Sequence, residues 1–330
     1  MKQSYYIFNN GDICRHDNTF RFINDAGDKR DFPVERVADI YFMSEISLNS
    51  SFINFAAKNG INLHFFNYYS FYTGSFYPKE SLVSGNLLVK QVEHYTDVNK
   101  RLEIAKEFVS GAIDNIYRNL RYYNERDRDL KEIMLEISSL GKSVANANNI
   151  KELMGYEGNA RKFYYKAWSS IIAQGVEFDK RVKNPPDNMV NTLISFVNML
   201  VYTRVLSEIY HTQLNPTVSY LHEPGTRRFS LSLDIAEIFK PLIGDRLIFT
   251  LLNRQQITEK SFTSGLNYLH LTQQASKTVV EEFDKRLKQT IKHKELGREV
   301  SYSHLIRLEC YKLVKHLLGE KPYSAFRLWW

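Results

Sequence analysis

The sequence predicts an α+β protein of two domains: a β-strand-rich, sandwich-like domain over residues 1–88 and a larger all-α domain over residues 89–330. A chain of 330 residues exceeds the roughly 150 that one domain usually takes. Short aromatic and β-branched runs fill the first ninety residues, and helical spacing of apolar residues follows. The domain junction is expected near residues 85–97, where the strand-like pattern of apolar residues changes to helical spacing.

Turn residues end each short run of the first domain, which predicts strands. Asn10-Gly11 predicts a hairpin after the first run, because both central positions of such a turn favour positive φ. Ser50–Gly60 is predicted as one short helix, with serine at its start and glycine after its last turn. The predicted strands are Tyr5–Phe8, Thr19–Ile23, Pro33–Phe42, Ile61–Tyr69 and Phe71–Tyr77.

Apolar residues three and four positions apart predict long amphipathic helices in the second domain. Pro185-Pro186 and Asn215-Pro216 are expected to interrupt them. The predicted helical segments are Val98–Tyr123, Asp127–Leu140, Asn149–Gln174 with Gly155 as a candidate break, Met189–Gln213, Leu231–Arg254 and Lys277–Leu318.

The cysteine content and the apolar stretches argue against several classes of protein. Cys14 and Cys310 are the only cysteines, which argues against a disulfide framework and a thiolate zinc site. The start of the chain has no apolar signal core. The most apolar stretches, Leu193–Leu206 and Leu242–Leu252, are interrupted by charged residues and are short for a membrane span. A cytoplasmic protein without a membrane segment is expected.

The net excess of positive charge lies in the second domain. Residues 1–90 hold nine basic and nine acidic side chains, so the other 240 residues, with 35 basic and 28 acidic, carry the net charge of +7. Lys277–Lys321 alone has 11 basic and 7 acidic residues. Such an excess indicates an anionic partner, most often nucleic acid. The alternative is a solvated, mildly basic helical surface.

Two carboxylates follow a loop histidine. His222 lies in a Pro-Gly loop, and Asp234 and Glu237 then interrupt an apolar run at positions that share one helix face. Acids in a buried helix are costly unless a cation compensates them. Carboxylates with one imidazole favour Mg²⁺ or Mn²⁺ over zinc. The alternatives are a hydrogen-bonded loop histidine and an ordinary ion pair between Glu237 and Lys240.

A further acid precedes this segment. Glu157 lies between Gly155 and Gly158, at a position interpreted as a helix start, and Arg161 follows one turn later. Flanking glycines permit close approach of backbone or ligand. The alternative is an exposed first-turn acid favoured by the helix dipole.

Three segments together resemble a known family. Gly155–Arg161, Tyr220–Glu223 and Leu233–Pro241 are similar, in this order, to the signature segments of the CRISPR-associated "Cas-one" family of spacer-acquisition integrases. The resemblance covers nearly the whole chain. It implies that Glu157, His222 and Glu237 hold Mg²⁺ or Mn²⁺, although many relatives have aspartate at the last position.

The resemblance also implies roles around the metal. Asp234 is a supporting acid or, alternatively, a buried partner of a neighbouring base. The cations expected to hold the DNA backbone, each with the alternative of a salt bridge to the acids, are Arg161, Lys240, Arg227 and Arg228.

By resemblance, the reaction is attack of a DNA 3′-hydroxyl on a phosphodiester of the repeat array. A homodimer, formed with the help of the β domain, and a small "Cas-two" partner protein are implied as well. The rivals are a repair or recombination nuclease with the same ligands and a non-enzymatic DNA-binding scaffold. The aromatic tail Pro322–Trp330 is expected to dock on its own domain or a partner subunit, with stacking on unpaired bases as the alternative.

Overall fold

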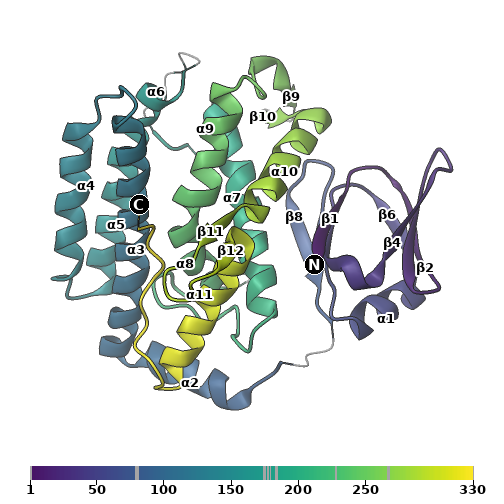
Figure 1. Cartoon of the computed structure of the whole chain (residues 1–330), viewed down its shortest axis with the longest axis horizontal. Coiled ribbons are helices and arrows are strands. Elements are labelled where there is room, and N and C mark those ends of the chain that lie inside the picture. The colour runs from purple at the N-terminus through teal and green to yellow at the C-terminus, as the bar shows by residue number, and fades with distance from the viewer. Residues whose placement is uncertain are drawn as a thin grey trace. The chain divides into compact units, whose positions relative to one another are not determined.

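The computed structural model describes residues 2–78, 82–173, 176, 178, 180–182, 185–226, 229–265 and 268–329 (Figure 1). Its contacts divide the chain into two compact units, Met1–Val83 and Ser84–Trp330. The boundary expected at 88/89 falls inside helix α2 (Gly85–Thr96), which Ser84 caps. The first unit is built mainly of strands and the second mainly of helices, as the sequence predicts.

Two four-stranded sheets form the first unit. In the first sheet, β1 (Gln3–Ile7), β5 (Val37–Phe42) and β7 (Asn62–Phe66) pair in parallel, and β8 (Tyr72–Phe76) is antiparallel to β7. In the second sheet, β4 (Lys29–Pro33), β3 (Thr19–Asn24) and β2 (Gly11–His16) are antiparallel, and β6 (Ile46–Leu48) pairs in parallel with β2. A short 3₁₀ turn, Val34–Arg36, precedes β5.

Helix α1 (Ser50–Lys58) joins the two sheets through one apolar core. Phe52 of α1 packs edge-on against Phe20 of β3, with ring centres 4.9 Å apart, and against Phe42 of β5 at 6.4 Å. All three rings are fully buried. Asn49 starts the helix by accepting a hydrogen bond from the Phe52 backbone N–H.

The hairpin predicted at Asn10-Gly11 is wrong. The flanking strands β1 and β2 belong to different sheets, and β2 forms its hairpin with β3 instead. Gly11 has φ of 152° and lies against β3, where an added Cβ would stand 2.1 Å from the Ile23 carbonyl oxygen. The glycine therefore allows two strands to approach closely and does not form a turn.

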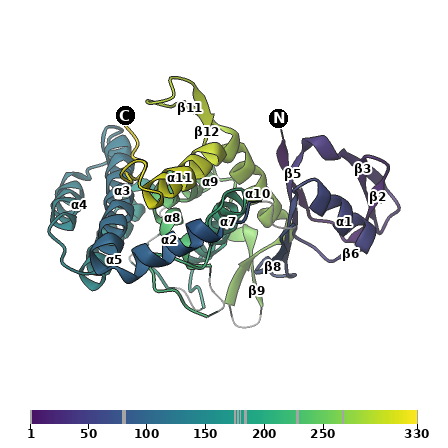
Figure 2. The same ribbon diagram turned by 90° about the horizontal axis from the view of Figure 1, so that it is seen from below.

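Most helices of the second unit begin at a capping side chain that accepts a backbone N–H of the first turn. Such caps are Ser84, Asp97, Asn149, Asn188, Thr272 and Ser301. After α2, the helices are α3 (Val98–Asn124), α4 (Lys131–Val144), α5 (Ile150–Lys166), α6 (Trp168–Ile171), α7 (Met189–Tyr210), α8 (Ser230–Phe239), α9 (Arg246–Asn253), α10 (Gln273–Lys288) and α11 (Tyr302–Leu317). Helices α3, α4 and α5 lie side by side (Figure 2).

The second unit differs from the expected all-α domain in three places. A π-helical segment, Lys240–Asp245, separates α8 from α9. The segment expected as helix from Lys277 to Leu318 is interrupted by a hairpin of β11 (Thr290–Lys292) and β12 (Glu299–Ser301). A second hairpin pairs β9 (Phe262–Gly265) with β10 (Tyr268–Leu271), after a 3₁₀ turn at Glu259–Ser261.

Helix α7 is the one described helix long and apolar enough to cross a membrane, and 72% of its apolar window is buried inside the protein. Its buried residues include Asn191, Arg204 and Glu208. Because it contacts α8, α9 and α11, α7 is the central core helix of this unit.

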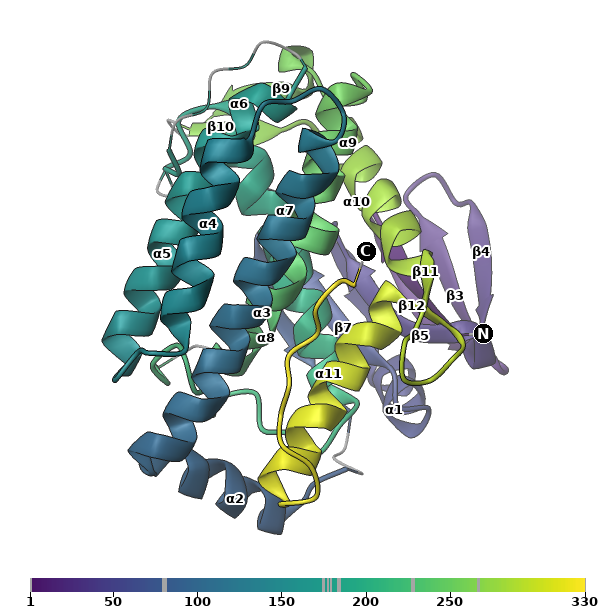
Figure 3. The same cartoon turned by 60° about the vertical axis from the view of Figure 1, so that its left-hand side comes forward.

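The C-terminal tail docks on its own unit, as the sequence predicts. It runs beside α11 and α3 (Figure 3). Phe326 stacks on Phe239 of α8, with ring centres 6.0 Å apart, and Asn115 of α3 accepts the Leu328 N–H at 2.9 Å. The Arg327 guanidinium forms ion pairs with the carboxylates of Glu107 and Asp114 of α3, at N···O distances of 3.0 and 2.7 Å.

This docking requires a glycine on α3. A methyl group at Gly111 would lie 2.7 Å from the Ala325 Cβ. We expect Gly111→Ala to lower the free energy of unfolding by about 1 kcal/mol or more, because overpacking outweighs the gain in helix propensity. The control Gly155→Ala, where an added Cβ meets nothing within 4 Å, should raise it by about 0.5–1 kcal/mol. Thermal or urea unfolding measures both, and equal effects would contradict the tail contact.

Candidate active site

Helix α8 and the π-helical segment after it position four charged side chains: Asp234, Glu237, Lys240 and Asp245. All four are buried. Pro241 has no backbone N–H to donate to the carbonyl one turn earlier, and a π-helical turn is common at functional sites. Two asparagines of α3 donate hydrogen bonds to backbone carbonyls where α8 passes into the π-helical segment. Asn115 donates to Ile238 O at 3.0 Å, and Asn119 donates to Pro241 O at 2.7 Å.

Asp234 holds in place the loop Tyr220–His222, called the histidine loop below. One carboxylate oxygen accepts the backbone N–H groups of Tyr220 and Leu221 at 2.7 and 3.0 Å. The other accepts the backbone N–H of His222 at 2.9 Å and lies 2.8 Å from the Nδ1 of its ring. Because Asp234 is fully buried, it fixes both the loop and the orientation of the imidazole.

The second ring nitrogen of His222, Nε2, makes no hydrogen bond to any residue in the described part of the chain. Burial opposes a charged imidazole here. The hydrogen bond and the negative charge of Asp234 outweigh burial, and the pKa of His222 is raised above its ordinary value of 6.5. Arg101 of α3 also pins the loop by donating to Tyr220 O at 2.8 Å.

Glu237 lies between two cations. Its carboxylate contacts Arg161 Nη2 at 3.0 Å and forms a short ion pair with Lys240. Burial alone would raise the pKa of Glu237, but Lys240 and Arg161 outweigh it and lower the pKa to about 2. Tyr202 of α7 supports the lysine, whose Nζ lies 4.8 Å from the centre of the tyrosine ring.

Arg161 of α5 connects three carboxylates. Besides Glu237, it contacts Asp245 at 3.2 Å and Glu157 at 3.6 Å. Burial raises the pKa of Asp245 to about 6, in spite of the guanidinium. Burial and repulsion from Glu237 raise the pKa of Glu157 as well. A buried cluster with this much negative charge favours a cation.

Glu157 lies in the middle of α5, which starts after Asn149, so the expected helix start at Glu157 is wrong. The helix also continues unbroken through Gly155. A Cβ added at Gly155 or Gly158 would meet nothing within 4 Å, so the glycines leave space on both sides of Glu157. The Glu157 and His222 side chains are 18% and 20% exposed, against 5% for Glu237, so these two residues form the solvent-facing side of the cluster.

The structure thus brings together most of the residues singled out from the sequence. Arg161 and Lys240 pair with the acids, as the salt-bridge alternative has it. Asp245 was missed as a member of the cluster, although an acid within an apolar run is the kind of signal that identified Asp234. Arg227 and Arg228 lie outside the described residues.

As the side chains stand, the described part of the chain holds no group of three His, Cys, Asp or Glu residues arranged to bind a metal ion. The donor chemistry nevertheless fits one. A histidine whose Nδ1 is held by a carboxylate, with Nε2 uncommitted, is typical of metal ligands. Glu157 and Glu237 would add oxygen ligands if Arg161 or Lys240 moved off Glu237, since these cations now neutralise it.

Comparison with known proteins identifies the family. The family model of the CRISPR associated protein Cas1 matches residues 5–285. The chain belongs to this family. The CRISPR-associated endonuclease Cas1 of Fusobacterium nucleatum is 63% identical over 100% of this chain and 98% of that protein. The resemblance, and with it the expected class of CRISPR-associated endonuclease and integrase, is confirmed at the level of this family.

Solved structures confirm the fold class. TM1797, a CAS1 protein from Thermotoga maritima, is 40% identical with a TM-score of 0.87, over 98% of this chain and 100% of that one. Two distant structures share the fold. A casposase bound to integration product is 19% identical with a TM-score of 0.86, over 99% and 96% of the two chains. A Cas6-RT-Cas1–Cas2 complex is 15% identical with a TM-score of 0.84, over 100% of this chain and 36% of that one.

Proposed function

We propose that this Cas1-family chain is a metal-dependent DNA endonuclease and integrase that inserts spacer DNA into a CRISPR array, with Mg²⁺ or Mn²⁺ as cofactor. The observation that carries the proposal is the cluster around Arg161 and Asp234, which gathers residues from α5, the histidine loop and α8. These are the three segments that resemble the family's signatures.

In this proposal Glu157, His222 and Glu237 hold the ion. When bound, it offsets phosphate charge and lowers the pKa of the attacking hydroxyl. Asp234 orients His222 through Nδ1, which would leave Nε2 to hold the ion. Arg161 or Lys240 would exchange Glu237 for the phosphate backbone of the DNA, to which a guanidinium binds well in a bidentate manner. Asp245 keeps Arg161 in place.

The reaction balances without an energy-supplying co-substrate. The oxygen of a DNA 3′-hydroxyl forms a bond to the phosphorus, and the bond from that phosphorus to the leaving oxygen of the array strand breaks. One phosphodiester replaces another, and the proton of the attacking hydroxyl passes to solvent or the leaving oxygen. With water as nucleophile the same residues cleave the strand.

The partners proposed are DNA (spacer precursor and repeat), a second copy of this chain, and a small "Cas-two" protein. The distant structure of a Cas6-RT-Cas1–Cas2 complex supports the last of these. The net charge of +7, all of it beyond residue 90, supports DNA as the ligand of the helical unit. Dimerisation through the β-rich residues 1–88 and a cytoplasmic location complete the proposal.

The test is a strand-transfer assay with a repeat-containing plasmid and the chain's partner protein. Joined product that depends on Mg²⁺ or Mn²⁺ is expected. Cleavage without joined product would favour a repair or recombination nuclease. Joining and cleavage that survive alanine at Glu157, His222 and Glu237 would show that these residues are not the catalytic metal ligands. DNA binding with neither joining nor cleavage would favour a non-enzymatic DNA-binding scaffold.

A pH dependence follows from the raised pKa of His222. A protonated imidazole has no lone pair for a metal ion, so protons and metal compete for the ring. We expect Mn²⁺ affinity to fall as the pH is lowered through this pKa, which lies above the 6.5 of an ordinary histidine. Calorimetric titration with Mn²⁺ over a pH series measures the effect. An affinity that stays constant down to about pH 5 would contradict the role of His222.

A further inference from the structure

A second charged feature of the helical unit is a pocket beneath the C-terminal tail, called the tail pocket below. It has a volume of about 430 Å³ and lies between the β11–β12 hairpin, α11, α3 and the tail. Its cationic lining residues are Arg118, Lys294, Lys312, Lys315, Lys321 and Arg327, and its one acidic lining residue is Glu295. A pocket of this size can hold a nucleotide-sized ligand.

Half of these cations already have acidic partners. Lys312 pairs with Glu309 at 2.7 Å, Lys321 with Glu295 at 3.6 Å, and Arg327 with two acids of α3. Arg118, Lys294 and Lys315 form no side-chain ion pair or hydrogen bond with any described residue. The tail pocket therefore carries about three uncompensated positive charges.

Hydrogen bonds from the paired cations and to Glu309 fix the tail residues that line the pocket. Lys312 donates to the Ser324 carbonyl oxygen at 2.6 Å, and Arg327 fastens the tail to α3. Buried Glu309 accepts the Tyr323 hydroxyl at 2.5 Å and the Phe326 N–H at 3.2 Å. The free cations thus face a preformed surface, which lowers the entropy cost of binding an anion there.

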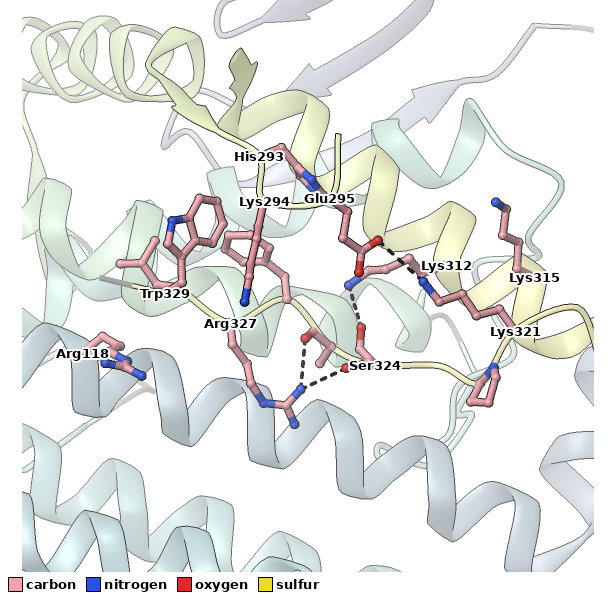
Figure 4. A pocket seen from close by; sticks show the side chains of 14 residues that line it. Arg118, His293, Lys294, Glu295, Lys312, Lys315, Lys321, Ser324, Arg327 and Trp329 are labelled. Carbon is pink, nitrogen blue, oxygen red and sulfur yellow. Dashed lines mark hydrogen bonds and ion pairs between the residues drawn. The ribbon is translucent and has the colours of Figure 1, made fainter. Parts of the chain in front are cut away.

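An aromatic ring stands at one end of the pocket. Figure 4 shows Trp329 beside Lys294 and Arg118, with Lys315 and Lys321 at the other end. The indole is 37% exposed and packs edge-on against Phe326, with ring centres 6.1 Å apart. A positively charged groove with an aromatic side chain for stacking is how proteins bind single-stranded nucleic acid.

The tail pocket is separate from the candidate active site. On α8, Glu237 and Phe239 project about 160° apart, because successive residues of a helix turn by about 100°. Glu237 faces Arg161 of α5, whereas Phe239 stacks on Phe326 of the tail. The helix that carries the acids therefore lies between the two sites.

We propose that the tail pocket is a second nucleic-acid contact, which binds the phosphates of a single-stranded segment through Lys294, Lys315 and Arg118 while Trp329 stacks on one of its bases. This inference rests on the DNA-processing function proposed above. A single strand is favoured over a duplex because base pairs in a helix are already stacked on both faces. An acidic protein segment would satisfy the lysines but, unlike a base, would not stack on the exposed part of the indole.

The test measures binding of a short labelled oligothymidylate to the full-length chain by fluorescence anisotropy over a salt series. Lys294→Gln with Lys315→Gln should reduce the slope of log affinity against log salt by about 1.4, since each lost phosphate contact removes about 0.7. The matched control, Lys260→Gln with Lys277→Gln, removes two exposed lysines outside the pocket and should leave the slope unchanged.

The aromatic contact is tested separately. Trp329→Leu should weaken binding by about tenfold, whereas Trp329→Phe, which keeps a ring, should retain most of it. An iodouracil-containing strand should photocrosslink to the tail peptide that includes Trp329. A duplex of equal length should show neither the Trp329 effect nor the crosslink.

The proposal is overturned if the pocket variants bind like the control pair, or if no crosslink reaches the tail. It is also overturned if an oligoglutamate peptide binds through the same lysines as tightly as the strand, which would indicate a protein-docking site, or if inorganic phosphate alone competes equally well. Glu237→Gln separates the two proposals. It should abolish strand joining and keep the binding to the tail pocket, so either can fail without the other.

Discussion

Glu237→Gln is expected to reduce strand joining and cleavage by about three orders of magnitude. The neutral amide has nearly the shape of the carboxylate but loses the charge that would hold a metal ion. It also leaves Lys240 and Arg161 near each other without the acid that now separates them. Joining is measured with plasmid and spacer DNA, and metal affinity is measured by calorimetry with Mn²⁺.

The same change destabilises the protein, so a control is needed. Removing one partner of a buried ion pair costs about 3–5 kcal/mol. Glu208→Gln is matched, because Glu208 is buried on α7 and also contacts two cations, Arg204 and Arg307, outside the site. We expect both variants to unfold at lower temperature, but only Glu237→Gln to lose Mn²⁺ binding. Equal metal affinity in the two variants would show that Glu237 is only a structural partner.

Asp234→Asn is expected to weaken metal affinity and strand joining by about 10- to 100-fold, the usual effect of losing the residue that orients a metal-binding histidine. The carboxylate now accepts from three backbone N–H groups and contacts the His222 ring. An asparagine replaces one acceptor oxygen with an NH₂ group, which would face donors. The loop of Tyr220 and His222 therefore loses part of its support.

The pH profile distinguishes this role from a purely structural one. The negative charge of Asp234 helps to raise the pKa of His222, so its removal should lower that pKa. The pH below which Mn²⁺ affinity declines should then move downward in Asp234→Asn. A variant that is less stable but keeps the wild-type pH profile would argue that Asp234 only supports the loop.

The acids and the histidine could be predicted from the sequence, but their partners could not. Asp234 and Glu237 are conspicuous because they interrupt an apolar run. In an unbroken α-helix, Asp245 would project about 80° away from Glu237. The π-helical segment has a wider turn and changes that angle, so that both acids reach Arg161. Local spacing alone does not reveal this.

In the first unit, local sequence patterns likewise predict strands but not how the strands pair. Runs such as Thr19–Ile23 predict strands because alternation is local, and β3 confirms this one. Pairing is not local, since β1 joins β5 in parallel across about thirty residues of chain. Gly11 resembles a turn residue in the sequence, yet it is required by the close approach of β2 to β3. The β11–β12 hairpin was missed because the basic, amphipathic composition continues through it.

A crystal structure of the chain with Mn²⁺, located by its anomalous scattering, tests the proposed metal site most directly. We expect one ion bound by Glu157, His222 Nε2 and Glu237, with Asp234 still on His222 Nδ1 and with Arg161 or Lys240 moved off Glu237. If the ion binds elsewhere, or if Arg161 and Lys240 both keep their ion pairs with Glu237 at saturating Mn²⁺, the proposed metal site is wrong.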